Sequence, residues 1–159
     1  AVSNCCIPNS ATMARSIQVS ALDRSECWSV PSAPCHNAMD LLVLIAKTAD
    51  VCRKPWRHAV VLVDPSAAVE LDDLNVRIEC RDGDGKRQTE HDLALEVYRS
   101  GAEINLMLSW WDQPNRPLLW HGRHPVWMSG ETGERCSAPA DAAPIEALGR
   151  RLRSLLQPD

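Results

Sequence analysis

The sequence predicts an α+β fold of two layers, in which an antiparallel β-meander of four to five strands carries an N-terminal and a C-terminal helix on one face. Two observations lead to this prediction. Consecutive segments between residues 74 and 111 alternate apolar and polar side chains, and apolar side chains recur at helical spacing near residues 36–53 and 142–156. Because an amphipathic helix must bury its apolar stripe, the apolar face of the meander is the surface on which both helices are expected to pack.

The first helix is expected over residues 36–53, after Pro34, which suits a first turn. Pro55 ends it because proline cannot continue the helical hydrogen-bond ladder. Its apolar face comprises Ala38, Leu41, Leu42, Ile45, Ala49 and Cys52. The polar side chains expected on its solvent side are Asp40, Lys47, Asp50 and Arg53.

Four strands are predicted near residues 58–63, 74–81, 92–98 and 103–111. The first is a continuous apolar run after His58, which is typical of a strand that is buried on both faces or central in a sheet. The other three alternate, so each has an apolar face and a wet face. By this alternation Trp110 belongs to the apolar face, whereas Asp92 and Trp111 belong to the wet face. A last strand is expected between Leu118 and Met128, broken at Gly122.

The closing helix over residues 142–156 has Asp141 as its expected N-cap. Its apolar stripe comprises Ile145, Leu148, Leu152 and Leu155. Three arginines near its end, Arg150, Arg151 and Arg153, suit a solvated face beside the negative end of the helix dipole.

The chain is expected to divide into a loosely ordered N-terminal arm over residues 1–34 and a single α+β domain over residues 35–159. The arm is rich in Ser, Asn and Pro, and Met13 within it is an alternative start. The sequence contains no apolar run long enough to span a bilayer and does not begin like a signal peptide, so a cytoplasmic location is expected.

Charge and cysteine content exclude several classes of function. The net charge of −4 gives no electrostatic reason to bind nucleic acid or an anionic membrane. The seven cysteines are odd in number and include no Cys-x-x-Cys pair, so we expect free thiols, no structural zinc and no cofactor. Cys27, Cys35 and His36 are the nearest approach to a zinc set, but they lack the usual close ligand pair.

The feature that points to function is a cluster of tryptophans between Ser109 and Trp127. Four of the six tryptophans lie there, in a chain without phenylalanine. Clustered indole rings mark a demanding part of the core or a binding surface. If the last strand pairs back after the Pro-rich turn, Trp111 would have Trp120 or His121 as neighbours, and an adjacent Arg or His could hold a ligand by stacking. The alternative is that the N-terminal arm, with its own Trp28, covers this outer face.

The leading hypothesis is therefore a binding or adaptor protein, without catalytic activity, for a protein partner or an apolar ligand, with a homodimer left open. The expected contact residues are Trp111, Trp120, Trp127, Arg116, Arg123, His121 and His124. The runner-up is a small-molecule enzyme with a cavity in which His121 and His124 serve as acid and base. A metal-dependent regulator, in which these histidines bind a metal with Cys136 or Asp112, is the third hypothesis.

Overall fold

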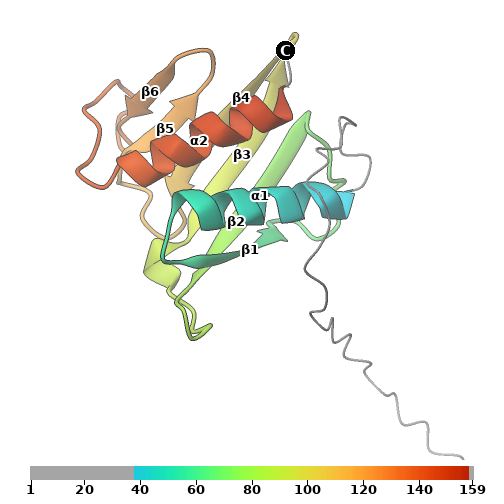
Figure 1. Ribbon diagram of the computed structural model, residues 1–159. Coiled ribbons are helices and arrows are strands. Elements are labelled where there is room, and N and C mark those ends of the chain that lie inside the picture. The colour runs from blue at the N-terminus through green and yellow to red at the C-terminus, as the bar shows by residue number, and fades with distance from the viewer. Residues whose placement is uncertain (1–37, 158–159) are drawn as a thin grey trace, which may run out of the picture. The chain divides into compact units, whose positions relative to one another are not determined.

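The computed structural model describes residues 38–157, which form a six-stranded antiparallel sheet with two helices (Figure 1). In the sheet each strand pairs with its neighbours in sequence, in the order β1-β2-β3-β4-β5-β6. The strands are β1 (Arg57–Leu62), β2 (Asp73–Arg81), β3 (Leu93–Ser100), β4 (Glu103–Trp110), β5 (Leu118–His121) and β6 (Pro125–Met128). A short 3-10 helix, η1 (Thr89–His91), precedes β3. The predicted meander is confirmed, with six strands.

The sixth strand arises because the chain reverses its direction at Gly122. The sequence predicts only a break in a single last strand at this position. Trp120 in β5 pairs with Val126 in β6 across this turn. A Cβ atom on residue 122 would lie 2.6 Å from Cη2 of Trp120 and 2.8 Å from Oδ1 of Asn105. Glycine therefore allows the turn to pack directly beneath the Trp120 indole.

Both helices, α1 (Ala38–Cys52) and α2 (Ala143–Leu156), lie on the same face of the sheet, as predicted (Figure 1). α1 packs on β1 and on α2, and α2 packs on β4 and β5. Gly149 brings α2 close to the sheet, since a Cβ there would lie 3.1 Å from Cδ2 of His121. The core between the layers is aliphatic, and its fully buried members include Ile45, Ile78, Leu95, Leu106, Leu119 and Leu148.

The end of α1 differs from the sequence prediction. Arg53, expected in solvent, is buried, and its guanidinium donates to the carbonyl oxygen of His91 over 2.8 Å. Asp50 accepts hydrogen bonds from the backbone N–H of His58 over 2.7 Å and from its ring at Nδ1 over 3.0 Å. The connection from α1 to β1 is only a few residues long, so β1 covers the polar side of the last helical turn.

Two details of β1 and α2 also differ from expectation. β1 is an edge strand, and Val61 is 40% exposed, so this strand is not buried on both faces. Asp141 does not cap α2, which has no side-chain cap, and instead accepts from Arg116 over 2.7 Å. The stripe of α2 ends with Leu156, while Leu155 is exposed.

Within residues 38–157, no helix has the length and apolar character needed to cross a membrane. The expected N-terminal arm, with Met13, lies outside the described residues.

Candidate functional site

The sheet divides the tryptophan cluster between its two faces. Trp110 and Trp127 face the helices and are 4% and 7% exposed, with ring centroids 6.3 Å apart. Nε1 of Trp127 donates to Glu146 of α2 over 2.8 Å. The inward direction of Trp110 agrees with the alternation in sequence, and Trp127, expected at a binding surface, is part of the core.

The opposite side of the sheet, which we call the open face, has neither α1 nor α2 on it (Figure 1). Trp120 is partly exposed there, and its Nε1 donates to the hydroxyl of Tyr98 over 2.6 Å. In the strand register Trp120 lies opposite Met107 and not opposite Trp111. The two tryptophans therefore occupy different parts of this face.

Trp111 belongs to a charged cluster at one end of the open face. The guanidinium of Arg77 lies 4.7 Å from the centroid of the Trp111 ring and donates to Asp92 over 2.8 Å. Asp92 is fully buried and also accepts from Arg87 over 2.6 Å and from the backbone N–H of Cys80 over 2.7 Å. The neighbour expected beside Trp111 is thus Arg77, which is already held by a buried carboxylate.

Partly exposed apolar side chains gather on the β4–β6 half of the open face. Trp120 pairs with Met107 on one side and with Val126 on the other, and Leu118 pairs with Met128. Alternation places all of these side chains on the same side of the sheet. We call this group the apolar patch: Met107, Leu118, Trp120, Val126 and Met128.

Arg116 lies on the helix side of the sheet and closes the end of the core. Its guanidinium lies 3.5 Å from the centroid of the Trp110 ring and donates to Asp141 over 2.7 Å. The first contact holds the loop before β5 against the end of β4, and the second holds it against the segment that leads into α2. Arg116 therefore does not take part in the apolar patch.

His121 and His124 are in different surroundings. His121 is buried beneath α2, and its Nδ1 lies 3.2 Å from the carbonyl oxygen of Gly122. Burial lowers the pKa of His121 below its ordinary value of 6.5. The hydrogen bond with the Gly122 carbonyl raises this pKa, and the positive charges of Arg153 and Arg150 lower it. His124 is exposed in the turn between β5 and β6.

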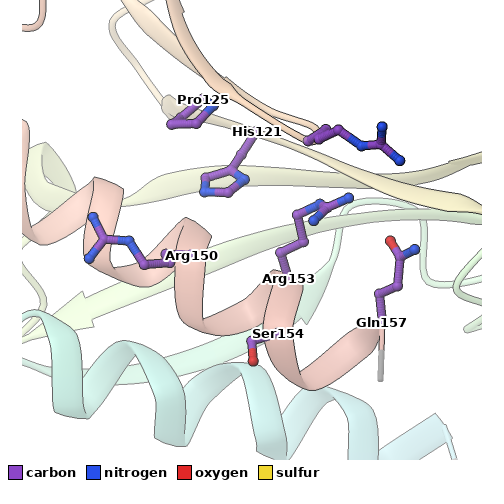
Figure 2. A pocket seen from close by; sticks show the side chains of 7 residues that line it. His121, Pro125, Arg150, Arg153, Ser154 and Gln157 are labelled. Carbon is purple, nitrogen blue, oxygen red and sulfur yellow. The ribbon is translucent and has the colours of Figure 1, made fainter. Parts of the chain in front are cut away.

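A hollow of about 410 Å³ lies between the end of α2 and the β5–β6 turn. His121 of β5 and Arg123 of the β5–β6 turn line one side of it. Arg150 and Arg153 of α2 and Gln157, which follows the helix, line the other side (Figure 2). His124 is not among its lining residues. The pair of imidazoles expected to act as acid and base is therefore not brought together in this hollow. We call it the cationic hollow.

Among residues 38–157, no group of three or more His, Cys, Asp or Glu side chains is arranged to hold a metal ion. Cys52, Cys80 and Cys136 are free thiols. Burial raises the pKa of Cys52 and of Cys80 above the ordinary value of 9.0. Cys27, Cys35 and His36 lie outside the described residues.

Comparison with known families identifies the domain. Residues 42–155 match the family described as a domain of unknown function, DUF8659. The chain belongs to this family. The match begins in the second turn of α1 and ends in the last turn of α2, so it includes the whole sheet and most of both helices. No curated protein matches the chain, and no solved structure matches it.

Proposed function

We propose that this DUF8659 protein is a cytosolic binding protein that recruits a protein partner through the open face of its sheet, with Trp120 at the centre of the contact. The observation that carries the proposal is the apolar patch, whose members lie side by side on three strands. Large apolar side chains that share one exposed surface are a recurrent mark of protein interfaces.

A protein partner fits this surface better than a small apolar ligand. Small-molecule sites are concave and enclose most of their ligand. The apolar patch stands on the strands of an open sheet, and both helices that could form a wall lie on the other face (Figure 1). A broad surface of this kind is matched by an equally broad surface on another protein.

The residues around the patch are suited to a polar rim. Trp111 and Arg77 lie at one end of the open face, and His124 lies in the β5–β6 turn beside it. Indole and guanidinium groups are enriched in interfaces, because they combine apolar area with hydrogen-bond donors. Trp127, His121 and Arg116 are left out of the proposed contact because they lie on the helix side. Arg123 is left out because Glu103 holds it beside Arg153 of α2.

The proposal is tested by photo-cross-linking in the native cell. A photoreactive amino acid at Leu118 or Met128 is expected to capture the same partner protein, whereas one at Arg151 on α2 should not. The captured partner is then purified, and its affinity is measured for the wild type, for Met107→Lys and for Val61→Lys. Val61 is exposed on β1, at the opposite edge of the sheet, and serves as the matched control.

We expect Met107→Lys to weaken binding at least about tenfold, because a buried hot-spot contact contributes roughly 2 kcal/mol. Val61→Lys should bind like the wild type, and both variants should retain the wild-type melting temperature within a few degrees. Cross-links that lead only to residues 1–37 of the same chain, or only to a second copy of it, contradict the proposal.

A further inference from the structure

The cationic hollow is a second candidate site, on the side of the sheet away from the apolar patch. Its lining comes from segments far apart in sequence, residues 121–125 and 150–157 (Figure 2). The favourable interaction with the helix dipole is a sufficient reason for arginines near the end of α2. That interaction does not explain why Arg123 of the β5–β6 turn lines the same hollow.

The hollow has an excess of positive charge. It is lined by Arg123, Arg150 and Arg153, and the carboxylate beside them is that of Glu103. Glu103 accepts from Arg123 over 2.8 Å and from Arg153 over 3.3 Å, so one negative charge is shared between two guanidinium groups. Arg150 has no hydrogen-bond or ion-pair partner in the part of the chain that the structure describes. Counted over residues 38–157, three positive charges against one leave a formal charge of +2.

The opposing charge of the helix is smaller than this excess. The C-terminal end of an α-helix carries about half a negative charge, which falls off within the last turn. The excess of +2 therefore dominates at the mouth of the hollow, although the whole chain has a net charge of −4. A protein with a negative net charge repels an extended polyanion, so the ligand favoured by this distribution is a small anion.

We propose that the cationic hollow binds a doubly charged oxyanion group, namely phosphate or a phosphate monoester of a small molecule. Guanidinium groups recognise phosphate by paired N–H donors, and arginines on two elements can approach it from different sides. Gln157 at the rim adds an amide for a polar substituent. A volume of about 410 Å³ accommodates a molecule of that size.

The experiment is a titration of the isotope-labelled full chain with inorganic phosphate and then with phenyl phosphate, followed by the arginine Nε–Hε signals in NMR spectra. Saturable shifts are expected at Arg150, Arg153 and Arg123. Arg150→Gln should raise the dissociation constant about tenfold, because a hydrogen bond between charged groups is lost. Tighter binding of phenyl phosphate than of inorganic phosphate would identify a monoester as the ligand, and the reverse would identify free phosphate.

Arg151→Gln is the matched control, because Arg151 is the exposed neighbour of Arg150, has the same charge and does not line the hollow. It should bind phosphate like the wild type. Arg123→Gln tests the contribution of the sheet and should weaken binding as Arg150→Gln does. Equal losses for Arg150→Gln and Arg151→Gln, or shifts that do not saturate, overturn the proposal. Tighter binding of a short oligonucleotide, with steep salt dependence, also overturns it.

A second readout comes from His121, which forms the floor of the hollow. The charged groups that face it are Arg150 and Arg153 of α2, and its own Nδ1 lies beside the Gly122 carbonyl. A bound dianion offsets the two guanidinium charges, so the pKa of His121 should rise when phosphate is added. The C–H signals of the imidazole report this pKa directly. No rise under saturating phosphate would place the anion elsewhere and contradict the proposed site.

Discussion

Asp92 is a carboxylate with no exposed surface, and its charge is balanced entirely by groups of this chain. Arg77, Arg87 and the backbone N–H of Cys80 all donate to it. Removing one member of a buried ion pair is costly because the remaining charges keep their desolvation penalty without compensation.

Asp92→Ala should therefore lower the free energy of unfolding by about 3–5 kcal/mol. The control is Asp72→Ala, because Asp72 pairs with Arg99 over 2.6 Å while 67% of its own side chain is exposed. An exposed pair contributes roughly 0–1 kcal/mol. Urea denaturation of both variants measures the difference, and similar losses would show that the Asp92 cluster contributes no more than a surface pair.

Alternation alone assigns Asp92 to the wet face, although it is fully buried. Its burial depends on partners that lie 5 to 15 positions away in sequence and reach it only after β2 has paired with β3. The same limit applies to Arg53, which is covered by β1. Local periodicity reports the direction of a side chain but not what other segments place over it.

At the scale of elements, β4 and the residue that follows it show how reliable alternation is within a strand. Trp110 shares the inward direction of Ile104, Leu106 and Leu108, and all four are buried. Trp111 has the opposite direction and lies against Arg77. The two adjacent indoles therefore contribute to different parts of the molecule.

Trp110→Ala should leave a large cavity in the core and lower the free energy of unfolding by about 3–5 kcal/mol. Trp111→Ala should cost clearly less, because it removes a partly exposed ring and a cation–π contact of roughly 0.5–1 kcal/mol. Thermal and urea denaturation of the two single variants makes the comparison. If both variants lose the same stability, the division of the cluster between the two faces is incorrect.

The candidate surfaces could be predicted only in part. Alternation is enough to place Trp111 and Trp120 on one face. It also assigns Met107 to that face once the bounds of its strand are known. It does not reveal that Trp127 is inward, because this assignment requires the additional turn at Gly122 and the β5–β6 register. The cationic hollow cannot be read from the sequence, since it depends on α2 lying beside the β5–β6 turn.

At the scale of the whole molecule, two buried imidazoles connect stability with pH. Burial lowers the pKa of His58 below 6.5, although its hydrogen bond to Asp50 opposes the shift. Burial lowers the pKa of His121 in the same direction. The unfolded chain therefore takes up protons more readily than the folded one in the range just below the ordinary pKa.

The free energy of unfolding should be largest above pH ~6.5 and should fall as the pH decreases through the lowered pKa values of His58 and His121. Urea denaturation at several values between about pH 7.5 and 5 measures this slope. His58→Gln should make the slope shallower, with the contribution of His121 remaining. An unchanged slope in His58→Gln would contradict the assignment.

The meander has a consequence for how the chain can be shortened. Each strand lies beside its neighbour in sequence, so the sheet is built from short loop closures with small entropic costs. The helices are different, because α1 and α2 come from opposite ends of the domain and pack against each other. Each helix covers apolar side chains of the sheet that the other helix does not contact. Deleting either helix therefore exposes one side of the core along the sheet, and a truncated chain should lose the fold as a whole.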